Sequence, residues 1–117
     1  MRITVIGAYG YTGLLICAEL VKAGINFSIS GPNKEKLDTL KNSSKLIEKV
    51  IVMDVTNATD CQHLIDQNDI IVNCAGPFTE NSNVLLEIVS NSNCAYLDIS
   101  GEAEFIFDSF EKNHKNA

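Results

Sequence analysis

The 117-residue sequence lacks any apolar run long enough to cross a membrane as a helix, which takes about 20 residues. It also lacks a convincing signal peptide. The first residues, MRITVIGAYGYTGLL, are partly apolar, but Gly7, Gly10 and Gly13 interrupt them and Glu19 follows. We therefore expect a soluble protein with no membrane span.

Basic residues are scarce, with 9 Lys and Arg against 15 Asp and Glu and a sequence pI of about 4.7. A surface that neutralises nucleic-acid phosphates or anionic lipid needs the opposite balance, so neither partner is expected. Residues 1–49 nevertheless carry seven basic and four acidic residues, a balance of +3, whereas residues 50–117 carry two and eleven, a balance of −9. The first half is therefore the better place for an anionic ligand.

Paired cysteine motifs are absent as well. Cys17, Cys61, Cys74 and Cys94 lie far apart, and no two of them form a C-x-x-C pair, so the sequence spells out neither a zinc site nor a redox motif. Each cysteine has apolar neighbours, which is typical of reduced, packed thiols. We expect a cytoplasmic protein without a metal site.

The sequence does contain an alternation of short apolar runs and helix-like segments, with 45% apolar and 21% charged residues. The runs of strand length are Ile3–Ile6, Phe27–Ile29, Val50–Met53, Ile70–Cys74 and Ala95–Ile99. The helical segments are Thr12–Ala23, Lys34–Lys41, Ala58–Gln67, Ser82–Ser90 and Ala103–Lys112. This alternation predicts an α/β domain with a doubly wound, Rossmann-like parallel sheet, strand order 3-2-1-4-5 and helices on both faces.

Two of the helices carry further signals. In the first, Leu15, Ile16 and Leu20 with the small Ala18 predict the face that packs on the sheet. The second follows Asn33, a residue that commonly caps helix amino termini. The helix predicted from Ala58 is preceded by Thr56 and Asn57.

The segment GAYGYTG, residues 7–13, directly follows a predicted strand and opens a predicted helix, as a dinucleotide-binding turn requires. Gly7 would permit the tight turn, Gly10 the approach of a pyrophosphate and Gly13 close helix packing. The intervening residues, which would also line the phosphates, are Ala8, Tyr9, Tyr11 and Thr12. The G-x-x-G-x-x-G spacing is one residue longer than the form usual in NAD-linked dehydrogenases. The alternative is a turn with helix packing in any α/β protein.

The end of the second predicted strand offers no carboxylate before Glu35 to bind the ribose 2′-hydroxyl of NAD. A 2′-phosphate would be tolerated there, which favours NADP over NAD. Its candidate partners are Ser30, Gly31, Asn33, Lys34 and Lys36, although the usual arginine is missing. The alternative is that Gly31-Pro32 is merely a turn and the two lysines belong to a solvated helix face.

Taken together, the segments GAYGYTG, SGPNKEKL, MDV, VNCAGPF and YLDISGE resemble the saccharopine dehydrogenase-like family, over nearly the whole chain. That family includes the saccharopine dehydrogenase NADP-binding domain and related trans-acting enoyl reductases. The resemblance implies the NADP(H)-binding domain of an oxidoreductase, which holds the dinucleotide for hydride transfer.

The resemblance also implies roles for individual residues. Asp54 matches a position near the adenine, and Pro32 stands where the family carries arginine. The stretch under the nicotinamide-side ribose matches Cys74, Ala75 and Gly76. The floor of the reaction cleft matches Pro77 and Phe78, and the motif after the last strand matches Asp98, Ser100, Gly101 and Glu102.

Read without the family, Asp98, Glu102 and Glu104 cluster after the last predicted strand. They are candidates for general acid or base groups, for contacts with substrate, or for metal ligands. The alternative, which we favour, is that the glutamates serve the start of the last helix. Neither His63 nor His114 falls near enough to complete a metal site, and no catalytic residue is assigned.

The expected organisation is one NAD(P)-binding domain, residues 1–117, followed by a substrate domain that would hold a small molecule against the cofactor. The isolated domain is expected to be inactive, and either self-association or a mobile C-terminal helix is expected. A non-catalytic NADP(H)-sensing or scaffold module is the alternative function. A short-chain reductase is disfavoured, because Tyr9, Tyr11 and Tyr96 are not followed four residues later by lysine.

Overall fold

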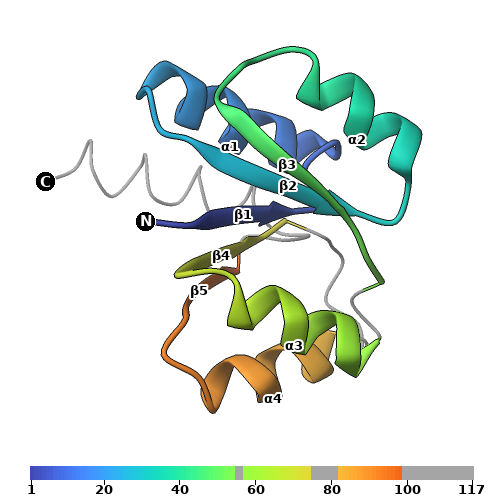
Figure 1. Ribbon diagram of the computed structural model, residues 1–117, viewed down its shortest axis with the longest axis vertical. Helices are drawn as coiled ribbons and strands as arrows, with labels where there is room; N and C mark the ends of the chain where they lie inside the picture. The colour runs from blue at the N-terminus through green and yellow to red at the C-terminus, as the bar shows by residue number, and fades with distance from the viewer. Residues whose placement is uncertain (55–56, 75–81, 99–117) are drawn as a thin grey trace, which may run out of the picture.

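The computed structural model describes residues 1–54, 57–74 and 82–98, which form a parallel sheet covered by helices on both faces (Figure 1). The strands are β1 (Ile3–Ile6), β2 (Phe27–Gly31), β3 (Ile47–Val52), β4 (Ile70–Asn73) and β5 (Ala95–Asp98). Their order is β3-β2-β1-β4-β5, and all neighbours are parallel. The predicted doubly wound fold and strand order are confirmed.

Helices α1 (Tyr11–Lys22) and α2 (Lys34–Lys41) cover one face of the sheet, and α3 (Ala58–Asp66) and α4 (Ser82–Ser90) cover the other (Figure 1). Successive strand side chains point to opposite faces. Val5 accordingly packs with the core under α1 and α2, and Ile6 with the core under α3 and α4. The sheet therefore separates two apolar clusters, which explains why its central strands read as continuous apolar runs.

Two sequence predictions differ from the structure. Strand β3 begins at Ile47 rather than Val50, because Ile47 pairs with Phe27 while Glu48 and Lys49 are exposed along this edge strand. Charged residues are common at an exposed sheet edge, but they interrupt the apolar run from which a strand is predicted.

The predicted packing face of α1 is wrong for Leu15 and Ala18, which are exposed, while Ile16 and Leu20 do pack against the core. The face nearest the sheet is instead centred on Gly13 and Cys17, four residues apart. The helix predicted at Ala103–Lys112 lies outside the described residues.

The cap of α2 and the packed thiols follow the predictions, and the structure adds a cap on α3. The Asn33 side chain accepts a hydrogen bond from the Lys36 amide at 3.0 Å, and Asn57 does the same for Asp60. All four cysteines, which lie within the described residues, are thiols rather than disulfides. Burial raises the pKa of the Cys17 and Cys61 thiols to about 11, so both stay protonated and unreactive at neutral pH.

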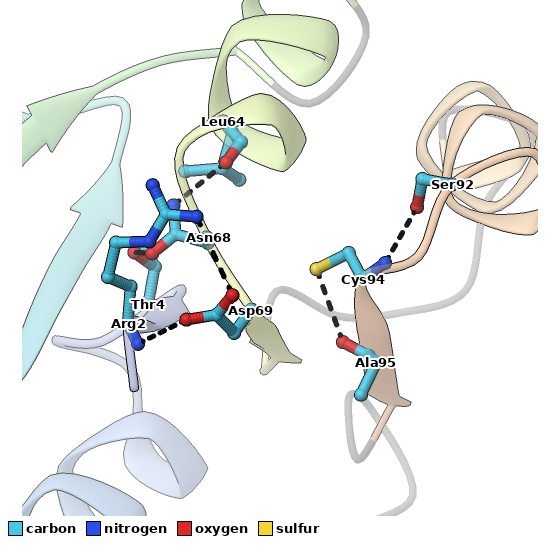
Figure 2. Close-up of polar contacts among 8 residues, drawn as sticks. All are labelled: Arg2, Thr4, Leu64, Asn68, Asp69, Ser92, Cys94 and Ala95. Atoms are coloured by element: carbon cyan, nitrogen blue, oxygen red, sulfur yellow. Dashed lines mark hydrogen bonds and ion pairs between the residues drawn. The ribbon is translucent and has the colours of Figure 1, made fainter.

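A polar network ties the start of β1 to the start of β4 (Figure 2). The buried Thr4 hydroxyl donates to Asn68 Oδ1 at 2.7 Å, and Asn68 Nδ2 donates to the Leu64 carbonyl at 2.8 Å. Nearer the surface, the Arg2 backbone and guanidinium both bind Asp69, which lowers the pKa of that carboxyl. Within the described ranges no helix is long and apolar enough to cross a membrane.

The buried part of this network should matter more than the exposed part. Thr4→Val removes the hydroxyl and leaves Asn68 Oδ1 buried without that donor, so we expect the free energy of unfolding to fall by about 1–3 kcal/mol in urea denaturation. Arg2→Ala is the control and should change stability little, because its ion pair is screened by solvent. A larger loss for Arg2→Ala would contradict this ranking.

Candidate functional site

The carboxyl ends of the strands share one edge of the sheet, and the chain direction across the sheet reverses there. In the central strands, Ile6 pairs with both Ser30 of β2 and Asn73 of β4. Between β2 and the outer strand β3, Gly31 pairs with Val52. The reversal falls between β1 and β4, and in open sheets of this kind ligands bind beyond the strand ends at such a point.

The glycine turn leaves β1 at this reversal. Gly7 has φ +73°, a left-handed conformation that side chains disfavour, and its N–H donates to the Ser30 carbonyl at 2.8 Å. The Gly10 N–H donates back to the Gly7 carbonyl at 3.1 Å, and the Leu14 N–H donates to the Gly10 carbonyl at 2.9 Å. The chain thus passes from strand β1 to helix α1 through this short turn alone.

Gly10 and Gly13 serve different purposes. A Cβ on Gly13 would lie 2.1 Å from the Gly7 carbonyl oxygen and 2.7 Å from Ala8 Cα, so α1 packs on the turn only because this side chain is missing. A Cβ on Gly10 would lie 3.4 Å from the same oxygen, an ordinary contact. Gly10 is exposed and has φ −74°, so the fold does not require glycine there. A ligand that approaches the backbone here would require glycine.

The amino end of α1 is open to an anion. Its N-cap is Gly10, which has no side chain to accept a hydrogen bond, and the first turn carries no acidic residue. Helix amino termini present free N–H groups and the positive end of the helix dipole. Of the predicted turn residues, Ala8 is buried, Thr12 is half-buried and Tyr11 is exposed. The arrangement fits a phosphate group.

At the end of β2 the structure places Ser30 and Gly31 inside the protein. The Ser30 side chain is fully buried, and its hydroxyl has no hydrogen-bond partner within the described part of the chain. Gly31 lies under the Tyr9 ring, where an added Cβ would sit 2.8 Å from Tyr9 Cε1. The contact of Ser30 with a 2′-phosphate stays a prediction that needs this hydroxyl to become accessible.

The remaining donors after β2 lie at the surface. The Asn33 N–H donates to the Tyr9 hydroxyl at 3.2 Å. Lys34 Nζ bonds Asp38 Oδ2 at 2.7 Å, which raises the pKa of the lysine, whereas Lys36 Nζ lies 5.3 Å from the centre of the Tyr9 ring. Tyr9, from the glycine turn, therefore contacts both the β2–α2 connection and α2 itself.

Other predicted site residues are placed only in part. Asp54 is exposed just beyond β3, and its N–H donates to Asp60 Oδ2 at 3.4 Å. Cys74 is buried, and its N–H donates to the Ile6 carbonyl at 2.8 Å. Asp98 ends β5, although its side chain is not described. The predicted residues that lie outside the described ranges are Ala75, Gly76, Pro77, Phe78, Ser100, Gly101, Glu102 and Glu104.

The sequence interpretation missed a hydrogen bond at the carboxyl edge. Asn73 is 1% exposed at the end of β4, and its Nδ2 donates to the Tyr96 hydroxyl of β5 at 2.9 Å. The sequence signal for it was that a polar residue, Asn73, ends an otherwise apolar strand. Among the described residues, no group of three His, Cys, Asp or Glu side chains could hold a metal ion.

Known proteins resemble this chain over nearly its whole length. A family model for the saccharopine dehydrogenase NADP binding domain matches residues 3–116. A probable mitochondrial saccharopine dehydrogenase-like oxidoreductase of Arabidopsis thaliana is 27% identical over 94% of this chain and 27% of its own length. The lipid droplet localized protein of Caenorhabditis elegans is 27% identical over 98% of this chain and 30% of its own. The chain thus spans about three tenths of the length of these relatives.

Solved structures share the fold. Apo saccharopine dehydrogenase (L-Glu forming) from Saccharomyces cerevisiae matches 86% of this chain and 22% of its own, with a TM-score of 0.71 and 17% identity. A short-chain dehydrogenase/reductase from Vibrio parahaemolyticus matches 76% of this chain and 51% of its own, with a TM-score of 0.67 and 15% identity. At these identities the likeness concerns the fold alone.

The two glycines make a matched pair for mutagenesis. Gly10→Val should leave the fold intact and abolish dinucleotide binding, because its side chain would fill space that a pyrophosphate needs. Gly13→Ala should instead lower the free energy of unfolding by about 1–3 kcal/mol, since its methyl group overlaps the turn. Thermal denaturation and calorimetric titration of both variants separate the two effects. A Gly10→Val protein that binds NADPH normally would show that the turn is purely structural.

Proposed function

Since this chain belongs to the saccharopine dehydrogenase NADP-binding domain family, we propose that its glycine turn and the end of β2 hold NADPH or NADP⁺ for hydride transfer in an oxidoreductase. In this arrangement the amino end of α1 binds the pyrophosphate, and the β2–α2 connection binds the adenosine ribose. Asp54 lies toward the adenine. The segment from Cys74 onward lies toward the nicotinamide.

The observation that carries the proposal is the exposed, uncapped start of α1 at the reversal of strand order. Gly10 leaves this surface bare although the fold itself would accept a side chain there. A bare glycine that packing does not require is explained by a ligand that approaches the backbone. The same ligand benefits from the excess of basic residues in residues 1–49.

When bound, the cofactor supplies a nicotinamide that gives or accepts hydride. The residues of this chain bind and orient it: the α1 amides hold phosphate, and Gly13 keeps those amides pressed against the sheet. We propose that a second domain, for which the greater length of the relatives leaves room, closes over the cofactor and holds a small-molecule substrate. Orientation and exclusion of water both need such a wall.

Two further features of the whole protein are proposals. A cytoplasmic location is supported by the four cysteines, which are thiols rather than disulfides. Self-association is supported by the edge strand β5, on which Leu97 is 58% exposed. A sensing or scaffold role would keep cofactor binding without turnover.

We expect NADP⁺ and NADPH to bind this chain more tightly than NAD⁺ and NADH, because β2 ends without a carboxylate for a free 2′-hydroxyl. Isothermal titration calorimetry with both oxidised cofactors at one salt concentration measures the ratio of Kd values. Tighter binding of NAD⁺ would overturn the assignment, and binding of neither cofactor would overturn the proposed function.

We also expect these 117 residues to bind cofactor without catalysing its oxidation. Incubation with NADPH and a panel of imine and enoyl compounds, followed at the nicotinamide absorbance, tests this beside the longer protein. Turnover by the longer protein alone would support the two-domain arrangement, and turnover by neither would favour the sensing role. Turnover by this chain at the same rate would place the catalytic groups here.

A further inference from the structure

Two lysines at the start of α2 have different surroundings although both were candidates for binding a phosphate. Lys34 Nζ is held by the Asp38 carboxylate at 2.7 Å, one helical turn along. Lys36 forms no ion pair within the described part of the chain, and its ammonium lies over the Tyr9 ring, 5.3 Å from the ring centre. An aromatic face attracts a cation but leaves its charge uncompensated. Of the two lysines, Lys36 is therefore the one whose positive charge is not balanced by a carboxylate.

The Tyr9 side chain is itself held firmly. Its hydroxyl accepts the Asn33 N–H at 3.2 Å, and its ring is packed on the bare backbone of Gly31. A methyl group at Gly31 would lie 2.8 Å from Tyr9 Cε1, so the ring could not lie there over any other residue. The ring thus bridges the glycine turn and the end of β2, the two segments between which the adenosine ribose is bound in doubly wound sheets.

Tyr9 and Lys36 also line a surface groove of about 550 Å³ between α1 and α2. Leu14 and Leu40 give it apolar walls, and Glu35 lines it as well. Glu35 carries the opposite charge, so the groove as a whole does not select anions. Any selectivity must come from where the Lys36 ammonium lies, over the ring of Tyr9 from the glycine turn.

We propose that Lys36, positioned by the face of Tyr9, is the cation that recognises the 2′-phosphate of NADP(H) in this chain. Lys36 takes the part that arginine plays elsewhere, at a place in the sequence where Pro32 leaves no cation. Tyr9 acts as a positioning residue, and Lys34 contributes less to recognition because the Asp38 carboxylate partly balances its charge. This assignment rests on the proposed function, since it concerns the same cofactor.

The test compares Kd values of NADP⁺ and NAD⁺ for the full chain and its variants by calorimetry. Lys36→Met keeps the apolar stem and should weaken NADP⁺ binding about 10- to 100-fold, the size of one charge-assisted hydrogen bond, with NAD⁺ unchanged. Lys34→Met is the matched control and should weaken NADP⁺ binding much less than Lys36→Met does, with NAD⁺ unchanged. The preference of the parent chain should also shrink as salt rises, because charge carries it.

The role of Tyr9 is tested by the same ratio. Tyr9→Phe keeps the aromatic face and should keep most of the preference for NADP⁺, whereas Tyr9→Leu should lose it while still binding NAD⁺. If Lys36→Met leaves the ratio unchanged, or if Lys34→Met reduces it equally, the assignment is overturned while the proposed function stands. If the parent chain binds neither cofactor, both fall together.

Discussion

The first turn of α1 lies so close to the Gly7 carbonyl that even one methyl group on Gly13 would not fit. This contact fixes where the helix starts and how near it comes to the sheet. It sets Gly13 and Cys17 toward the core, and it leaves Gly10 and Tyr11 outside. The bare surface at the start of α1 and the reach of Tyr9 toward β2 both depend on that approach. A single packing contact thus determines both the bare start of α1 and the reach of Tyr9 toward β2.

Much of the fold follows from the sequence because parallel strands buried on both faces must be continuously apolar. Two strands can be recognised in the sequence on that ground, Ile3–Ile6 and Ile70–Asn73. The pattern fails at the edge strand, where the successive residues Glu48 and Lys49 are both exposed. It fails on α1 for another reason: Gly13, with no side chain, carries no hydrophobic signal yet marks the closest contact.

The site could be predicted from the sequence in outline but not in detail. Glycine spacing and helix caps are local properties, so the turn and the role of Asn33 could be inferred. The bond between Asn33 and Tyr9 joins residues 24 positions apart, and the bond between Asn73 and Tyr96 spans 23. No local pattern encodes such pairs. For the same reason Lys34 and Lys36 look alike in the sequence and become distinct only when their neighbours in space are known.

The strand order also separates charge in space. The half of the domain built from β1, β2, β3, α1 and α2 holds the excess of basic residues, while described residues 57–74 and 82–98, which supply α3, β4, α4 and β5, contain no lysine or arginine. The boundary between the halves coincides with the reversal of strand order between β1 and β4. A dinucleotide carries more negative charge at its phosphorylated adenosine end than at its nicotinamide end. This separation of charge favours an approach in which the adenosine phosphates face the half of the domain with the excess of basic residues.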